Sequence, residues 1–271
     1  MTSRALDVDA VTALVEEVAA AVVTPRFRAL ADGDVHAKGP GDLVTVADHE
    51  AEVLLAQGLG RLLPGVPVVG EEDAAAHPEV LRALVDAPLA WVVDPLDGTR
   101  GFVAGTGDHA VMVGLVEHGQ AVAGWIHQPE HGRTFVAERG AGAFANGVRI
   151  TRPAAPARFA ELRGGVATRY LSAEVLAAVD AARFGPGVET SLGMWSGIAY
   201  PRVATGERDF VLFWRTWPWD HAPGAVLVRE AGGVSRRLDG SDYRPGVDAA
   251  GLLVAADGDT WQSVREALRL G

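Results

Sequence analysis

Near the start of the chain, apolar residues recur at the spacing of an α-helix. The pattern extends over residues 8–30 and predicts an amphipathic helix that packs one face against the rest of the protein. Its apolar positions are Val11, Leu14, Val15, Val18 and Val22. Six further helices are expected from periodicity and capping signals, over residues 49–63, 78–85, 172–182, 196–205, 222–231 and 260–270.

Short apolar runs between these segments predict strands. A loop rich in Gly, Asp and Pro is expected over residues 31–41. Residues 151–159, rich in Pro and Ala, are the best candidate boundary between two halves, 1–150 and 151–271. The strands are expected over residues 67–69, 89–93, 111–117, 120–128, 134–138, 142–148, 162–167, 209–214 and 251–255.

Composition narrows the classes of partner and of chemistry. The 271 residues carry a net charge of −11 and no basic run, so neither a nucleic-acid polymer nor an anionic membrane surface is an expected partner. The chain has no cysteine, which excludes disulfides, thiolate zinc sites and cysteine nucleophiles. We expect a cytoplasmic protein, because the N-terminus has no signal-peptide core and no stretch approaches the length of a membrane span.

The stretch WVVDPLDGT, residues 91–99, combines a buried strand with a polar end. Asp94 and Asp97 bracket a stiffening proline, and the Leu96 carbonyl lies between them. Two carboxylates and a carbonyl on a stiff loop suit Mg²⁺. Gly98 and Thr99 offer backbone N–H groups where a helix could start, which suits a phosphate. The alternative is a strand followed by a polar turn with an N-cap.

Other acidic residues also lie at predicted element ends. Asp48 begins the helix expected at 49–63, either as its N-cap or as part of a site. Glu71 opens a run of three acids that repel each other unless they are solvated or share a cation. Asp220 is placed as an N-cap, with Trp214, Trp217 and Trp219 nearby as core residues or as a pocket wall.

Taken together, these segments resemble the inositol monophosphatase family of metal-dependent, lithium-sensitive phosphatases. Its superfamily includes fructose-1,6-bisphosphatases and 3′(2′),5′-bisphosphate nucleotidases. The segments are DLVTVAD (42–48), GEE (70–72), DPLDGT (94–99) and WDHAPG (219–224) with EAGG (230–233), in the family's order and spacing. The resemblance implies an α/β (α+β) fold, a layered αβαβα sandwich of the sugar-phosphatase type. Residues 1–150 would carry most metal ligands, and residues 151–271 would carry Asp220 and the substrate-selecting residues.

The resemblance also implies a metal-ligand set for two to three Mg²⁺ ions. Glu71, Asp94 and the Leu96 carbonyl match the ligands of the first ion. Asp94, Asp97 and Asp220 match those of the second.

Catalytic roles follow from the same resemblance. Glu71 and Asp48 match the acids near a third, weaker ion. Thr99 matches the hydroxyl that, with an acid, helps to activate the attacking water. The expected catalytic residues are therefore Glu71, Thr99 and Asp48, while the backbone of Gly98 and Thr99 would hold the phosphate.

The expected substrate side departs from the family pattern. Inositol-specific members usually carry a carboxylate several residues before the last aspartate, and residues 213–219 contain none. Arg215 and the tryptophans either bind a second phosphate or planar group, or serve in packing. The expected substrate contacts are Asp97, Gly98, Thr99, Arg100, Trp195, Ser196, Phe213, Arg215 and Asp220.

We therefore expect a Mg²⁺-dependent phosphomonoesterase that acts on a small phosphorylated metabolite and is inhibited by Li⁺. Inositol monophosphate, or a related sugar or polyol phosphate, ranks first as substrate. A bisphosphate nucleotide and histidinol phosphate are the alternatives. A catalytically silent protein that binds metal or phosphate is the alternative of a different class. The family is commonly dimeric, so a homodimer is one expected assembly.

Overall fold

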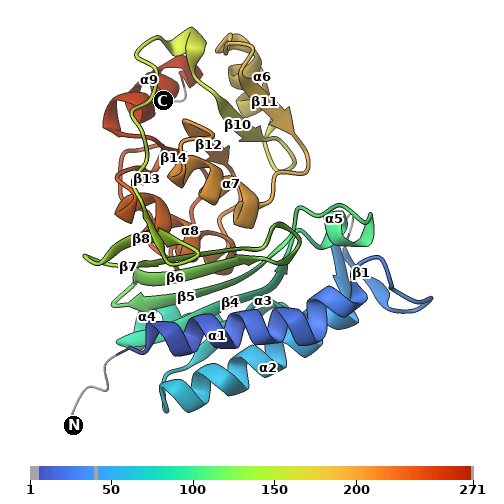
Figure 1. Cartoon of the computed structure of the whole chain (residues 1–271). Coiled ribbons are helices and arrows are strands. Elements are labelled where there is room, and N and C mark those ends of the chain that lie inside the picture. The colour runs from blue at the N-terminus through green and yellow to red at the C-terminus, as the bar shows by residue number, and fades with distance from the viewer. Residues whose placement is uncertain (1–5, 40–41, 270–271) are drawn as a thin grey trace.

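The protein is built of five layers in the order helices, sheet, helices, sheet, helices (Figure 1). The structure, a computed structural model, describes residues 6–39 and 42–269. The predicted layered αβαβα sandwich is confirmed. The helix layers contain α1 (Val8–Val18) with α2 (Val46–Leu62), then α7 (Ser196–Ala204) with α8 (Pro218–Glu230), then α6 (Ala173–Ala181) with α9 (Gly258–Leu268).

The larger sheet has seven strands in the order β3-β4-β5-β6-β7-β8-β9. Only the pairing of β3 with β4 is parallel among these described strands. The strand predicted at 142–148 divides at a turn over Asn146 and Gly147, both of which have positive φ. The strands are β3 (Val68–Gly70), β4 (Leu89–Asp97), β5 (Ala110–Glu117), β6 (Gln120–Gln128), β7 (Arg133–Glu138), β8 (Gly142–Ala145) and β9 (Val148–Ile150).

The smaller sheet has five strands in the order β11-β10-β12-β14-β13. The predicted strands at 162–167, 209–214 and 251–255 correspond to its three central strands. The two edge strands were not predicted, because each has only four residues and its sequence is largely polar. The strands are β10 (Gly164–Ala167), β11 (Val188–Ser191), β12 (Phe210–Phe213), β13 (Val234–Arg237) and β14 (Leu252–Ala255).

Helix α8 packs closely onto the larger sheet because the strands beneath it carry glycines. A Cβ atom built on Gly124 would lie 2.6 Å from the carbonyl oxygen of Pro223 in α8. One built on Gly114 would lie 3.3 Å from the Pro223 ring. A larger residue at Gly124 would therefore push the helix away from the sheet. The smaller sheet covers the other side of α8, so most of its residues are buried.

Two predictions for the N-terminal segment were wrong in detail. The helix expected at 8–30 is α only to Val18, then π over Ala19–Val23 and 3₁₀ over Thr24–Arg26. Pro25 lacks the N–H that an α-helix would need at that position. The loop expected at 31–41 contains β1 (Val35–Gly39), which pairs with β2 (Asp42–Thr45); residues 40 and 41 lie outside the described residues.

Helix boundaries also differ from those predicted. Helix α2 begins three residues earlier than position 49, and α8 begins four residues before position 222. The segment 78–85 is a 3₁₀ turn (Pro78–Arg82) followed by the short helix α4 (Ala83–Asp86). The helix expected at 260–270 is α9, and residue 270 lies outside the described residues. The short helix α3 (Glu71–Ala76) was not predicted. The short helix α5 (Thr99–Val103) begins after Gly98, where the sequence had indicated a possible helix start.

One hydrophobic core spans both halves of the chain. It joins Val92 and Met112 of the larger sheet to Val211 and Val254 of the smaller one, with α7 and α8 between them. Because this core is shared, it does not mark a boundary at residue 150, and the division there stays a prediction. In the described part of the chain, no helix is both long enough and apolar enough to cross a membrane.

Candidate active site

The parallel pairing of β3 and β4 brings two acidic residues together. Gly70 of β3 pairs with Val93 of β4, so the next residue of each segment reaches the same edge of the sheet. These next residues are Glu71, the first residue of α3, and Asp94, which is 1% exposed. The predicted proximity of these two acids therefore follows from strand register.

A bulge at the end of β4 turns a third acid into the same pocket. Asp94 pairs with Met112 and Asp97 with Ala110, so the β4 side of this interval contains one residue more than the β5 side. Alternation alone would direct the side chains of Asp94 and Asp97 to opposite faces of the sheet. The bulge changes that direction, and both acids line the pocket.

Asp220 reaches the site from the first turn of α8. Residue Trp217 is the N-cap of this helix, so the predicted N-cap role of Asp220 is wrong. Asp220 instead lies close to Glu71 and Asp94, and each of the three can offer an oxygen within 4.8 Å of the others. Three convergent carboxylate oxygens suit a hard divalent cation such as Mg²⁺.

Burial and mutual repulsion make this acidic cluster electrostatically costly by itself. Burial raises the pKa of Asp94 well above its usual value, and the charges of Glu71, Asp97 and Asp220 raise it further. The pKa of Asp220 is also raised well above its usual value by burial and then by Glu71 and Asp97. A bound cation would relieve this repulsion, so the donor set fits a metal.

Lys38 contacts the cluster through an ion pair with Glu71. Its ammonium lies 2.8 Å from Glu71 Oε1 and 2.7 Å from Glu72 Oε1. Burial opposes the charged form, but the two carboxylates outweigh it and raise the pKa of Lys38. Sequence reasoning did not single out Lys38, because its strand had been taken for a loop.

Glu52, a second residue that sequence reasoning missed, holds α3 in position. Its carboxylate accepts hydrogen bonds from the backbone N–H groups of Glu72 and Asp73, each at 2.8 Å. Gly70 leaves the room for this contact, because a Cβ there would lie 2.2 Å from the Glu52 carboxyl carbon. Burial raises the pKa of Glu52 to about 7 despite these hydrogen bonds. The available signal was that α3 starts with three acids and no capping side chain of its own.

Asp48 and Thr99 form the predicted acid–hydroxyl pair. The N-cap of α2 is Thr45, so the N-cap alternative for Asp48 is wrong; Asp48 is the third residue of a capping box. Its Oδ2 accepts hydrogen bonds from the Thr45 N–H at 2.8 Å and from the Thr45 hydroxyl at 2.6 Å. Its Oδ1 lies 3.1 Å from the Thr99 hydroxyl, which is also 3.0 Å from the Leu96 carbonyl. Burial raises the pKa of Asp48 to about 7.

The N-terminus of α7 holds Asp97. The backbone N–H of Gly197 donates to Asp97 Oδ2 at 2.8 Å, and the Ser196 hydroxyl donates to Oδ1 at 3.2 Å. A Cβ on Gly197 would lie 2.5 Å from the Ala110 side chain, so glycine is required at this position. Burial raises the pKa of Asp97 to about 6, although these hydrogen bonds oppose the shift. Ser196, expected to contact substrate, is directed toward Asp97.

One pocket contains nearly all the residues expected from the sequence. Trp214 also lines it, whereas Trp219 is 5% exposed in the central core and stacks on Trp217. Expected residues on its lining are Glu71, Asp94, Leu96, Asp97, Gly98, Thr99, Arg100, Trp195, Ser196, Phe213, Arg215 and Asp220. Lining residues not expected as contacts are Asp42, Leu43, Ala167, Arg169, Tyr170, Leu192, Met194, Trp214 and His221.

His221 fixes the backbone of Arg215 beside this pocket. Burial lowers the pKa of His221 to about 3, so the ring is neutral at physiological pH. Its Nε2 lies 3.0 Å from the Arg215 carbonyl, which can only accept, so Nε2 carries the proton. Nδ1 then accepts from the Tyr200 hydroxyl at 3.0 Å.

Comparisons with known proteins agree with this geometry. The family model "Inositol monophosphatase family" matches residues 6–269. An inositol-1-monophosphatase of Mesorhizobium japonicum is 36% identical over 220 residues, 76% of this chain and 76% of that protein. A histidinol-phosphatase of Chlorobaculum parvum is 32% identical over 216 residues, 78% of each chain.

The fold leads to the same family. A solved structure of an IMPase from Thermotoga maritima has a TM-score of 0.80 at 25% identity, covering 96% of this chain and 95% of that one. The chain belongs to the inositol monophosphatase family, whose members are phosphatases that hydrolyse phosphomonoesters.

Proposed function

We propose that the protein is a Mg²⁺-dependent phosphomonoesterase that acts on a small phosphorylated metabolite by attack of a water molecule. The observation that carries the proposal is the convergence of Glu71, Asp94 and Asp220 within 4.8 Å in a pocket. Family membership supports it, because a phosphatase site needs positive charge beside an anionic ester.

Four acids of the pocket have a proposed part in holding two to three Mg²⁺ ions. Glu71, Asp94 and the Leu96 carbonyl would hold the first ion, and Asp94, Asp97 and Asp220 the second. The ions would neutralise the ester, lower the pKa of bound water and stabilise the leaving alkoxide. Lys38 keeps Glu71 partly neutralised until a cation competes for it.

Thr99 and Asp48 are the proposed water-activating pair. When the Thr99 hydroxyl donates to Asp48 Oδ1, its oxygen keeps lone pairs that can accept a hydrogen bond from water. As the water loses a proton to the Thr99 oxygen, the Thr99 proton would pass to the Asp48 carboxylate, so the proton ends on Asp48. Asp48 cannot turn away, because its other oxygen is held by Thr45. Glu71 is the further acid of this catalytic set.

The phosphate is proposed to bind against the backbone of Gly98 and Thr99, where α5 begins. Gly98 has a φ of 87°, a left-handed conformation that glycine adopts without strain. It also has to be small, because a Cβ would lie 2.8 Å from the Asp108 carbonyl oxygen.

Inositol monophosphate, or a related sugar or polyol phosphate, is the first substrate class that we propose, because the Mesorhizobium relative is named for it. Histidinol phosphate, named in the Chlorobaculum relative, and a bisphosphate nucleotide are the alternatives. Cytoplasmic location, Li⁺ sensitivity and a homodimer are further parts of this proposal.

A phosphate-release assay on a panel of phosphomonoesters tests the proposal. We expect turnover with Mg²⁺ and none after the metal is removed by a chelator, with activity restored on adding Mg²⁺ back. Absence of turnover on every ester, in protein shown to be folded, would refute the enzyme and support the catalytically silent binder.

A further inference from the structure

The pocket lining carries charges of both signs. The acids on the lining are Asp42, Glu71, Asp94, Asp97 and Asp220, and they surround the proposed metals. The cationic and aromatic side chains of the lining lie next to these acids: Tyr170 is close enough to interact with the charges of Asp42 and Asp220, and Arg215 with that of Asp220. We call this part of the lining the leaving-group half; it consists of Arg100, Arg169, Tyr170, Met194, Trp195 and Arg215.

Arg215 is the best-placed cation of the leaving-group half. Its guanidinium carbon lies 4.1 Å from the centre of the Tyr170 ring. Within the described part of the chain, Arg215 forms no ion pair, whereas the nearby Arg208 pairs with Glu189 at 2.5 Å. Since His221 fixes its backbone carbonyl, Arg215 combines a held main chain with N–H donors available for a ligand.

Arg100 is a second cation with donors available. It follows Thr99 in α5, is exposed, and has no ion pair within the described ranges. Trp195 packs closely on the backbone around Gly98 and Gly101. A Cβ on Gly98 would lie 3.3 Å from the Trp195 ring, and one on Gly101 would lie 3.1 Å from its Nε1. The Trp195 ring therefore packs against the backbone that leads into α5 and forms a wall of the pocket.

A neutral polyol would use only part of these surroundings. Its hydroxyls could donate to the carboxylates of Asp42 and Asp220, but they carry no charge to match the guanidinium groups of Arg215 and Arg100. An anionic group, by contrast, forms charge-assisted and often bidentate hydrogen bonds with arginine. Beside it, the rings of Tyr170 and Trp195 suit an apolar or planar surface.

We propose that the true substrate carries a second anionic group, a phosphate or a carboxylate, on its leaving group, and that Arg215 with Arg100 binds it. This inference rests on the proposed phosphatase function and changes the order of the substrate classes given there. Among sugar and nucleotide phosphates it favours bisphosphates and carboxylated esters over inositol monophosphate.

Matched pairs of esters test the inference, each pair differing only in the second anion. The phosphate arm compares fructose 1,6-bisphosphate with fructose 1-phosphate, and adenosine 3′,5′-bisphosphate with adenosine 3′-phosphate. The carboxylate arm compares 3-phosphoglycerate with glycerol 3-phosphate. In at least one pair, we expect kcat/KM to be about ten- to a hundredfold higher for the member that carries the second anionic group, as charge-assisted hydrogen bonds imply. The arm that responds identifies the anion.

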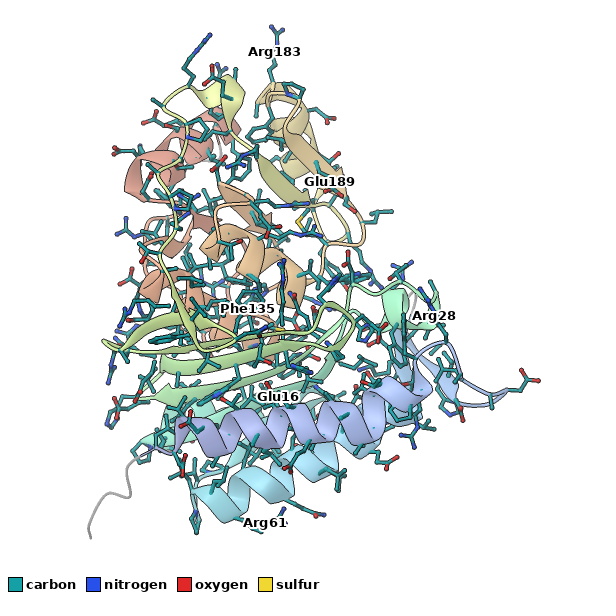
Figure 2. The ribbon with its side chains drawn as sticks, in the orientation of Figure 1. Glu16, Arg28, Arg61, Phe135, Arg183 and Glu189 are labelled. Carbon is teal, nitrogen blue, oxygen red and sulfur yellow. The ribbon has the colours of Figure 1, made fainter. Side chains whose placement is uncertain are left out.

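Variants then assign the preference to Arg215. Arg215→Met should reduce the ratio of kcat/KM within the responsive pair about tenfold or more, while Arg215→Lys should retain part of it. The lysine variant also keeps a positive charge near Asp220, which separates anion binding from an indirect effect on that carboxyl. Arg61→Met is the matched control, because Arg61 lies in the outermost helix layer and does not line the pocket (Figure 2). It should leave every ratio unchanged.

The outcomes distinguish this inference from the proposed function. The inference is overturned if the two members of every pair are hydrolysed equally well. It is also overturned if Arg215→Met lowers kcat/KM equally for both members of a pair. In either case the proposed phosphatase function stands. Binding of each pair in the presence of Mg²⁺, measured by calorimetry, gives a readout that needs no turnover. Equal affinity within all pairs would also overturn the inference, even if no ester is hydrolysed and the proposed function fails.

Discussion

The two halves of the pocket are built in different ways. The metal half, Glu71, Asp94, Asp97 and Asp220, comes from strand ends and helix first turns, where backbone hydrogen bonds set each position. The leaving-group half comes mostly from connecting segments outside regular elements. Regular elements restrict what their residues can be, whereas connecting segments tolerate change. The comparison suggests that the chemistry on phosphorus is held rigidly and that the choice of leaving group is the adjustable part.

The largest expected effect is on the metal half. Asp94→Asn should lower kcat/KM by at least about a thousandfold, because it removes a carboxylate shared by both proposed ions. The measurement is phosphate release at saturating Mg²⁺. Asp239→Asn, at an exposed acid remote from the pocket lining, is the control. Wild-type-like turnover in Asp94→Asn would refute the metal assignment.

The same substitution should have the opposite effect on stability. Without metal, Asp94 is one of several buried carboxyls whose charges raise each other's pKa. Asp94→Asn should therefore raise the melting temperature in chelator at pH 8 while reducing the stabilisation that Mg²⁺ provides. A lower melting temperature in chelator would show that Asp94 serves the fold rather than the metal.

A smaller loss is expected where the two halves meet, at Thr99. Thr99→Val keeps the shape of the side chain but removes the hydroxyl that pairs with Asp48. It should lower kcat about ten- to a hundredfold and change KM much less, as loss of proton-transfer assistance implies. Thr99→Ser should recover most of the rate. An equal loss in both variants would assign a packing role to the residue.

His221, which holds the backbone carbonyl of Arg215, should make the stability of the fold depend on pH. The folded-state pKa of His221 is about 3 and the ordinary value is 6.5, so the unfolded chain binds the extra proton between these values. Its contribution is complete above about pH 6.5 and is lost progressively as pH falls toward 3. Between pH 7.5 and pH 5 the loss should be about 2 kcal/mol in the free energy of unfolding.

Urea unfolding of wild type and His221→Gln at these two pH values checks this prediction. The variant should be less stable at pH 7.5, because it loses the hydrogen bonds of the His221 ring with the Tyr200 hydroxyl and the Arg215 carbonyl. Its stability should, however, change less with pH. Parallel pH dependence in both proteins would mean that His221 is protonated in the folded state, contrary to its burial.

The smallest expected effect is inhibition by Li⁺. Millimolar Li⁺ should reduce turnover partially by competing at the metal half, and its effect should be the same for the two members of each ester pair. Steady-state assays over a Li⁺ series, with K⁺ as the control cation, measure it. Insensitivity would place the protein nearer to the fructose-bisphosphatases of the superfamily.

Much of the fold could be read from periodicity, and the limits have local causes. Long apolar strands such as β5 and β6 were found because every second residue, or every residue, is buried. The edge strands β11 and β13 escaped because partners in the sheet, rather than their own residues, stabilise them. Pro218 and Trp219 begin α8 although they look like a loop, since proline is favoured in the first turn of a helix.

The candidate site divides in the same way. The motif around Asp94 by itself left two interpretations open, a site for metal and phosphate or a polar turn with an N-cap. The other segments, and the resemblance to the family that they carry together, favoured the metal and phosphate site. Nothing local marked Lys38 or Glu52, whose roles come from contacts 33 and 20 residues away along the chain. Ser196 is the converse case: the resemblance to the family implied substrate contact, and the fold directed its hydroxyl to Asp97.

The sequence by itself determined the chemical class, because carboxylates, a carbonyl and a hydroxyl must be present in the chain before any fold can gather them. Only the tertiary structure decided which of them meet. The register of β3 on β4 brings Glu71 and Asp94 together, and the bulge before Asp97 adds that residue. The close packing of α8 on Gly124 brings Asp220 to the same place. The tertiary structure also placed cations and rings on the same pocket lining as those acids, because long-range packing, rather than local preference, controls which loops come together.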